Sequence, residues 1–255
     1  MKILKGLCAG IAVAVFVLGL YTSCAAVTEI EGLVRIQLER FLDSAVAENL
    51  AAPLVFIEVP KVLNQLPKEV KQALVVVSRQ DESSQAELTA WHVSQKGWEA
   101  AISFIPVVIG RNSFAAEGYK KEGDGRTPSG IFKLGTAFGY ALSSKTGLAY
   151  RQATADDFWV DDPKSAQYNQ WVTGAPQAKS FERLKRDDDL YRYGVVIEYN
   201  VDPIVPGKGS AIFMHVWRGP DSPTAGCVAM SQENILGLLK WLDRGSHPVI
   251  VLGNK

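Results

Sequence analysis

The N-terminal part of the chain has two apolar patterns, a continuous run and a helical repeat. Residues 6–21 are almost uniformly apolar and lie between the lysines of MKILK and the small residues TSCAA. Further on, apolar residues recur at the spacing of one helix face, which predicts an amphipathic helix; these residues are Val34, Leu38, Phe41, Leu42 and Ala45. Prolines at positions 53, 60 and 67 then favour a connector. We therefore expect residues 26–70 to form a helical appendage and linker.

From Gln72 onward the pattern changes to short apolar or alternating runs separated by polar residues and glycines. Such runs are QALVVVS, AELTAWHVS and PVVIG, and later YGVVIEYN, SAIFMHV and HPVIVLG. Short strands with turn signals between them are typical of an all-β sandwich or barrel-like domain. The middle of this region, in EGYKKEGDGRTPSG and WVDDPKSAQYNQW, holds turn residues with little periodicity. We therefore predict one mainly β domain over residues 71–255.

One helix is predicted inside this β domain, in the segment SQENILGLLKWLD. Ser231 precedes it, and a serine side chain can accept hydrogen bonds from the free amides of a helix N-terminus. The apolar positions of the segment fall on one helix face; they are Ile235, Leu238, Leu239 and Leu242. The predicted helix therefore begins shortly after Cys227, the only cysteine of the domain.

The composition indicates an ordinary globular chain without a polyanionic partner. Of its 255 residues, 47% are hydrophobic and 21% are charged, which excludes a disordered protein. Lys and Arg together number 27, as do Asp and Glu, so the net charge is zero. Because nucleic-acid binders usually have a basic excess or a basic stripe, we expect no nucleic-acid partner.

The apolar run at residues 6–21 indicates where the protein acts. Positive residues, an apolar run and small residues in this order are the layout of a secretory signal peptide. The run is shorter than the stretch of about 20 residues that a transmembrane helix needs. We predict a signal peptide over residues 1–25 or a lipoprotein signal that ends before Cys24; an uncleaved anchor is the third alternative. The protein is then exported to the periplasm or cell envelope, either soluble or attached to the membrane through a lipid on Cys24.

Export leaves the chain with one thiol. Cys8 lies in the signal and Cys24 is either removed or lipidated, so only Cys227 remains as a free cysteine. A single unpaired cysteine in an exported protein is either a reactive thiol or a buried, inert side chain.

The segment FMHVWRGPDSPTAGCVAM brings candidate chemistry to this thiol. His215 falls near a strand end, and an imidazole beside a thiol lowers the pKa of the thiol. The helix predicted after Cys227 acts in the same direction, since a helix N-terminus carries a partial positive charge. The small residues Ala225 and Gly226 allow their amides, with that of Cys227, to point at an oxyanion. The alternative is a strand histidine bonded to the backbone and a glycine in a turn.

A metal site is not expected. His92 and His247 are far from this segment in the sequence, and no second Cys/His cluster exists. Zinc sites need three or four protein ligands, which these residues do not supply.

In these segments the sequence resembles the L,D-transpeptidases, whose catalytic domain is of the YkuD type. AIFMHVWRGPDSPTAGCVAM is similar to the family's catalytic element, in which a histidine follows a strand and a Ser/Thr-x-Gly-Cys motif comes later. VVIGRNSFAAEGYKKEGDGRTPSGIFKLG is similar to the family's upstream Thr-Pro-x-Gly segment. The resemblance covers residues 72–253 and implies a YkuD-type β-sandwich with a short helix after the catalytic cysteine.

The resemblance implies acyl transfer on peptidoglycan stem peptides without a cofactor. Cys227 would attack the carbonyl of a meso-diaminopimelate residue and release the terminal D-alanine, and the thioester would pass to an amine of a second stem. The catalytic residues that it implies are Cys227, His215 as the base, Val216 as the residue whose carbonyl orients the imidazole, and Gly226 of the motif.

The substrate-binding residues are less regular than the catalytic ones. Thr224 supplies the motif hydroxyl, whereas Ala225 stands where many family members have a histidine. Ala229 stands where many have an arginine, and Arg218 is our candidate to replace it. The loop between the histidine and the cysteine is also shorter than in well-known members, so the acyl acceptor stays open.

Three functions stay open on the sequence alone. If an amine accepts the acyl group from the thioester, the protein is a transpeptidase, and if water accepts it, the protein is an L,D-carboxypeptidase. If Ala225 and Ala229 are signs that the motif has lost its activity, the protein is a non-catalytic envelope-binding module. The sequence determines neither the oligomeric state nor the role of residues 26–70. Elsewhere, the run RDDDL at residues 186–190 is predicted to be a solvated loop. Trp159, Tyr168 and Trp171 either line a substrate groove or cap the core.

Overall fold

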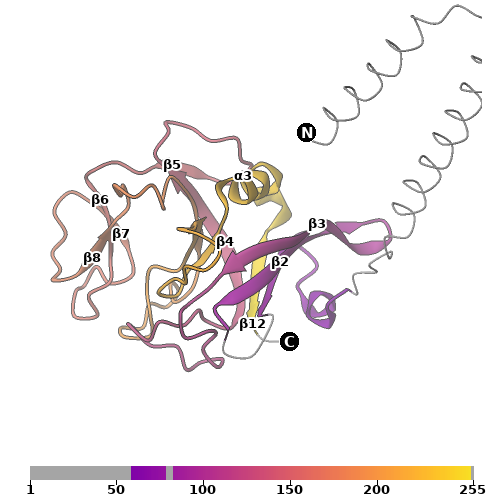
Figure 1. Cartoon of the computed structure of the whole chain (residues 1–255), viewed down its shortest axis with the longest axis horizontal. Coiled ribbons are helices and arrows are strands. Elements are labelled where there is room, and N and C mark those ends of the chain that lie inside the picture. The colour runs from indigo at the N-terminus through magenta and orange to yellow at the C-terminus, as the bar shows by residue number, and fades with distance from the viewer. Residues whose placement is uncertain (1–58, 79–82, 254–255) are drawn as a thin grey trace, which may run out of the picture. The chain divides into compact units, whose positions relative to one another are not determined.

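The computed structural model describes residues 59–78 and 83–253 (Figure 1). The predicted signal at residues 1–25 and most of the predicted appendage at 26–70 lie outside the described residues. Within the part that is described, no helix is long and apolar enough to cross a membrane.

Strands make up most of the described secondary structure, as the sequence pattern predicts. In chain order the elements are η1 (Lys61–Gln65), β1 (Gln72–Ser78), β2 (Gln85–Ser94), β3 (Gly97–Val108), β4 (Gly130–Gly139), β5 (Tyr150–Gln152), β6 (Asp157–Val160), β7 (Trp171–Thr173), β8 (Phe181–Arg183), β9 (Tyr193–Ile197), β10 (Phe213–Val216), β11 (Val228–Met230), α3 (Gln232–Trp241), η2 (Arg244–Ser246) and β12 (Val249–Gly253). The mainly β fold is therefore confirmed.

The large sheet closes on itself. Its strands follow the order β12-β1-β2-β3-β11-β10-β9-β4-β5, and β12 pairs with β4 as well as with β1. The pairing of β12 is parallel with β1 and antiparallel with β4. Alternate residues of a strand face opposite sides of a sheet, which explains why Ala86, Leu88 and Ala90 of β2 are all buried. The strand pairings therefore form a closed circuit around the main core.

The helix after Cys227 is α3, and it forms as predicted. The hydroxyl of Ser231 accepts a hydrogen bond from the amide of Asn234 at 3.2 Å, which caps the helix N-terminus. Ile235, Leu238 and Leu239 are buried in the main core. α3 packs against β9 and β10, and it thereby supports the strand that carries His215.

The middle of the domain holds three short strands that the sequence pattern did not indicate. β6 lies between β7 and β8 in a small sheet, on the side of the domain away from β2 and β3 (Figure 1). Trp159 of β6 is buried and packs edge-on against Phe213 of β10, with 5.0 Å between ring centroids. Tyr168 is also buried, so both aromatic side chains belong to the core. A second apolar cluster therefore joins the small sheet to the segment that holds Cys227.

Candidate active site

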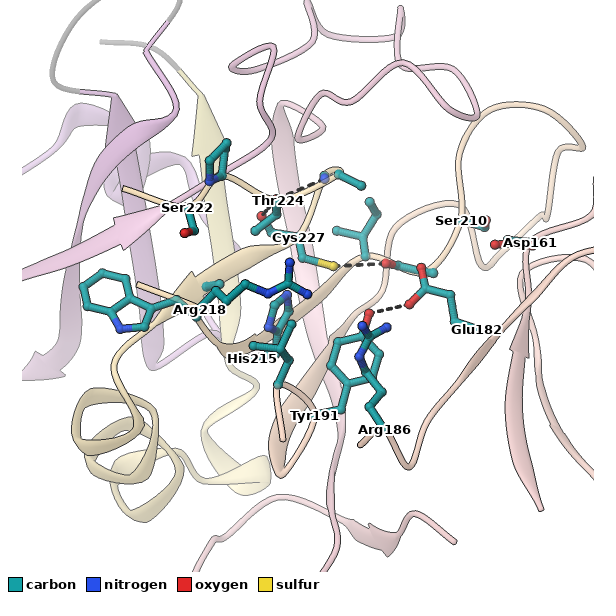
Figure 2. A pocket seen from close by; sticks show the side chains of 18 of the residues that line it. Asp161, Glu182, Arg186, Tyr191, Ser210, His215, Arg218, Ser222, Thr224 and Cys227 are labelled. Carbon is teal, nitrogen blue, oxygen red and sulfur yellow. Dashed lines mark hydrogen bonds between the residues drawn. The ribbon is translucent and has the colours of Figure 1, made fainter. Parts of the chain in front are cut away.

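Two neighbouring parallel strands bring His215 and Cys227 to the same cleft. His215 lies on β10, and Cys227 directly precedes β11, which pairs with β10 so that His215 stands opposite Ala229. Both side chains line a cleft of about 790 Å³, to which Ala229 also contributes. Figure 2 shows the sulfur of Cys227 and the imidazole of His215 on the same side of these strands. The two candidate catalytic groups, distant by twelve positions in sequence, thus share one cavity.

The Cys227 thiol is buried and bonded to the backbone. Its sulfur donates to the carbonyl of Ala211 at 3.2 Å and accepts from the amide of Phe213 at 3.4 Å. Burial, and next the negative charge of Glu182, raise the pKa of the Cys227 thiol to about 12. The free protein therefore holds Cys227 as a neutral thiol at pH 7.

The expectation that α3 lowers the pKa of Cys227 is wrong. α3 begins at Gln232, and strand β11 lies between the cysteine and the helix. The influence of a helix N-terminus is confined to its first turn, so a whole strand places Cys227 outside its reach. Burial and a nearby carboxylate then determine the direction of the shift.

The His215 imidazole is held in one tautomer. Its Nδ1 lies 2.7 Å from the carbonyl oxygen of Val216, the contact that the family resemblance implies. A carbonyl only accepts hydrogen bonds, so Nδ1 carries the proton and Nε2 has a free lone pair. Burial lowers the pKa of His215 to about 4, which keeps the ring neutral at pH 7. A neutral imidazole with a free Nε2 can accept a proton from a thiol.

The loop before Cys227 is braced by Thr224. Its hydroxyl donates to the carbonyl of Cys227 at 2.7 Å and accepts from the amide of Gly226 at 3.1 Å. The amide of Gly226 is therefore occupied, which differs from the expectation that it points at an oxyanion. Thr224 and Ala225 both line the cleft, but the bonds of Thr224 run to the loop itself.

The backbone conformation and the close neighbours at position 226 require glycine. Its φ is +154°, and a Cβ there would lie 2.9 Å from the carbonyl oxygen of Arg126 and 3.2 Å from Cδ1 of Ile212. We expect Gly226→Ala to lower the free energy of unfolding by about 1–3 kcal/mol, because backbone strain and the clash add. Thermal unfolding of the purified chain measures the change.

Gly219→Ala is the matched control for this prediction, because it lies in the same segment and its added Cβ would meet only Ser222 Oγ, at 3.9 Å. We expect its unfolding free energy to stay within about 0.5 kcal/mol of the wild type. Equal stability of the two variants would contradict the steric argument at Gly226.

A cationic rim borders the His215 side of the cleft. Arg186 binds Asp188 through two hydrogen bonds of 2.8 and 2.7 Å, and Arg218 reaches the same carboxylate at 3.1 Å. Arg186 and Arg218 both line the cleft, so the prediction of a merely solvated loop at 186–190 is wrong for Arg186. Arg218 is two-thirds exposed, at 67%, and it lines the same cleft as Ala229, which is compatible with the substitution predicted for it.

Carboxylates line the other side of the cleft. Glu122 accepts from the hydroxyls of Tyr168 at 2.5 Å and Ser210 at 2.7 Å, and Asp161 and Glu182 lie on the same side of Cys227 (Figure 2). Burial raises the pKa of both Asp161 and Glu182, and the negative charge of Glu122 raises each of them further. In residues 59–78 and 83–253, no group of three or more His, Cys, Asp or Glu side chains is arranged to hold a metal ion.

Glu182, Arg186 and Tyr191 belong to the candidate site although no sequence pattern indicates them. All three line the cleft beside Cys227. They come from β8 and the segment between β8 and β9, where the sequence has no periodic pattern. The only local signal was the charge density of the run RDDDL, which by itself is typical of a solvated loop.

The fold and the cleft define a mainly β protein that holds a buried cysteine and a neutral histidine in one cavity. Residues 75–251 match the family model of the L,D-transpeptidase catalytic domain, YkuD. The match spans more than two thirds of the chain, and the protein belongs to this family.

Among solved structures, the chain is similar to the helical cell shape determining protein Pgp2 from Campylobacter jejuni. The sequence identity is 15% and the TM-score is 0.37, and the match covers 72% of this chain and 49% of Pgp2. The chain therefore spans about half the length of Pgp2. A search of curated proteins found no match.

Proposed function

We propose that this protein is an L,D-transpeptidase of the cell envelope, which cross-links peptidoglycan stem peptides through a thioester on Cys227. One observation carries the proposal: Cys227 and His215 share a cleft, and the Val216 carbonyl leaves Nε2 of His215 free as a base. The family match supports the substrate class. Acyl transfer from a peptide needs no cofactor, because the donor bond supplies the energy of the product bond.

The reaction starts from a neutral thiol and a neutral imidazole. The thiol proton passes to Nε2 of His215 as Sγ bonds to the meso-diaminopimelate carbonyl carbon. His215 returns that proton to the D-alanine nitrogen as the C–N bond breaks, which leaves a thioester and free D-alanine. An amine of a second stem then attacks the thioester, and its proton passes through His215 to the sulfur of Cys227. These steps regenerate the free enzyme and require no thiolate on Cys227 in the resting state.

The test is incubation of the full chain, purified in detergent, with a disaccharide-tetrapeptide, followed by mass spectrometry. A dimer that lacks one D-alanine supports the transpeptidase. A tripeptide without a dimer supports the L,D-carboxypeptidase, in which water reaches the thioester first. Unchanged substrate overturns both catalytic functions.

The non-catalytic envelope-binding module is a second candidate, and the burial of Cys227 favours it. A thiol whose pKa is about 12 is a weak nucleophile in the free protein. Acylation by a carbapenem separates the candidates, because it requires a proton acceptor near the thiol as well as the thiol. A mass increase of one carbapenem on Cys227 supports catalysis, and an unmodified chain supports the binding module.

We expect slow alkylation of Cys227 by iodoacetamide in the free protein at pH 7, well below the rate of a free cysteine. Because the raised pKa of Cys227 is about 12, the thiolate fraction and the rate should still be rising between pH 8 and pH 10. Mass spectrometry of the peptide that contains Cys227, over this pH range, measures the rate. A fast rate that levels off near pH 7 would instead indicate a preformed thiolate–imidazolium pair.

We further propose that residues 1–25 direct export, that residues 26–70 are an appendage and linker, and that residues 71–255 are the catalytic domain. The family match at 75–251 supports the last of these ranges. Metabolic labelling with a lipid precursor separates lipidation at Cys24 from simple cleavage. Label that is lost in Cys24→Ala supports the lipoprotein. An unlabelled wild type supports the soluble protein if the N-terminal segment has been removed, and an uncleaved anchor if it is retained.

A further inference from the structure

Tyr191 touches the proposed catalytic base directly. Its ring packs edge-on against the imidazole of His215, with 5.1 Å between ring centroids and 71° between the ring planes. Tyr191 is buried in the second apolar cluster, which also includes Cys227. The ring therefore forms a wall against which the imidazole rests.

The far end of this wall is fixed by a carboxylate. The hydroxyl of Tyr191 donates a hydrogen bond to Glu182 of β8, drawn as a dashed line in Figure 2. The guanidinium of Arg186 lies over the Tyr191 ring, 5.1 Å from its centroid, and Phe213 packs edge-on at 5.6 Å. A ring held at its hydroxyl and on its sides cannot turn away from the imidazole without breaking these contacts.

The backbone ties the same two segments together. The carbonyl of Leu190 accepts a hydrogen bond from the amide of Val216 at 3.0 Å. Val216 is the residue whose own carbonyl holds Nδ1 of His215. The chain on either side of Tyr191 and the chain on either side of His215 are thus joined through both backbone and side chains.

We propose that Tyr191, anchored by Glu182, is a positioning residue that holds the His215 imidazole in the orientation in which Nδ1 meets Val216 and Nε2 is left for the cleft. The inference rests on the proposed function, since it assigns His215 the role of base. A single hydrogen bond contributes only about 1 kcal/mol, so the Val216 bond alone lets the ring rotate about its own side-chain bonds whenever that hydrogen bond breaks. The Tyr191 wall removes this remaining freedom, which matters because a misplacement of about 1 Å can reduce a rate about a hundredfold.

Two variants of Tyr191 separate the ring from its anchor. Tyr191→Leu removes the wall, so we expect kcat for acyl transfer to fall by about 30- to 100-fold with KM changed by less than about threefold. Tyr191→Phe keeps the wall and loses the bond to Glu182, so we expect a smaller fall of about 3- to 10-fold in kcat. Circular dichroism confirms that each variant folds.

A titration of His215 provides a readout that does not depend on activity. The chain has three histidines, so NMR in a Cys227→Ala background can follow each ring, with His92→Gln and His247→Gln for assignment. The charged groups that act on His215 are Arg186, which lowers its pKa, and Asp188, which raises it. Because Tyr191 contributes to the burial of the imidazole, Tyr191→Leu should raise the pKa of His215 from about 4 toward its ordinary value of 6.5.

Tyr168→Leu is the matched control, because Tyr168 is also a buried tyrosine whose hydroxyl donates to a glutamate, Glu122. We expect the pKa of His215 in this variant to stay near 4. The proposal is overturned if Tyr191→Leu and Tyr168→Leu leave kcat and the His215 titration equally changed or equally unchanged. If the wild type transfers no acyl group, the proposed function fails, and the titration still decides whether the Tyr191 ring packs over the His215 imidazole and buries it.

Discussion

We expect Cys227→Ala to abolish acyl transfer to stem peptides and to leave the domain folded. In the proposed mechanism the nucleophile is the sulfur of Cys227, and alanine retains no atom that can form the thioester. The side chain is small; its sulfur bonds to the backbone of Ala211 and Phe213 and packs in the second apolar cluster, so its truncation costs about 1–2 kcal/mol of unfolding free energy. We expect the rate of product formation to fall by at least about 10,000-fold.

Cys227→Ser sharpens this prediction because it keeps a hydrogen-bonding side chain at the same position. A serine hydroxyl is a far weaker nucleophile than a thiol when its partner is a single imidazole, so we expect a loss of at least about 1,000-fold. Mass spectrometry of the products with disaccharide-tetrapeptide measures both variants beside the wild type. Cross-linked dimer from either variant at the wild-type rate would show that Cys227 is not the nucleophile.

His215→Gln has the second largest expected effect. Glutamine keeps a polar side chain of similar reach but accepts no proton at neutral pH, so we expect kcat to fall by about 100- to 10,000-fold. The pH dependence has a defined sign. Because burial lowers the pKa of His215 to about 4, the wild-type rate should rise as the pH increases through about 4, where the imidazole becomes neutral, and stay level toward pH 7.

The pH–rate profile of kcat/KM for acylation measures this prediction, because it reports the ionisations of the free enzyme. The residual rate of His215→Gln should lack the rise near pH 4. A wild-type profile that rises instead near pH 6.5 would mean that His215 titrates with its ordinary pKa, as an exposed imidazole does.

Local patterns predicted the elements that depend on neighbouring residues. The run SQENILGLLKWLD contains the signals of its own capped helix, since Ser231 and the apolar face lie within a few residues of each other. The alternation in β2 gave its buried face in the same way. The pairing of β10 with β11, which brings His215 to the cleft of Cys227, has no such local signal. Nearness in sequence suggested the two residues as a pair, and the family resemblance implied their roles.

The rest of the site depends on contacts between distant segments. Glu182 reaches Tyr191 across the turn from β8, and Tyr191 reaches His215 on another strand. Neither residue belongs to a pattern along the chain. The predicted direction of the pKa shift of Cys227 is wrong for the same reason. Burial and the position of Glu182, which raise this pKa, arise from the fold, whereas the helix effect was inferred from nearness in sequence.

The closed circuit of strand pairings has a consequence for how the chain acquires its shape. The seam between β12 and both β1 and β4 is made by residues 249–253, the last strand of the domain. Until that strand arrives, β1 and β4 present unpaired edges, and such edges invite pairing with other chains. Contacts between the first and last strands are also the slowest kind to form. We therefore expect the domain to be protected against self-association only once its last strand closes the seam, and a chain truncated before Val249 to keep two open edges.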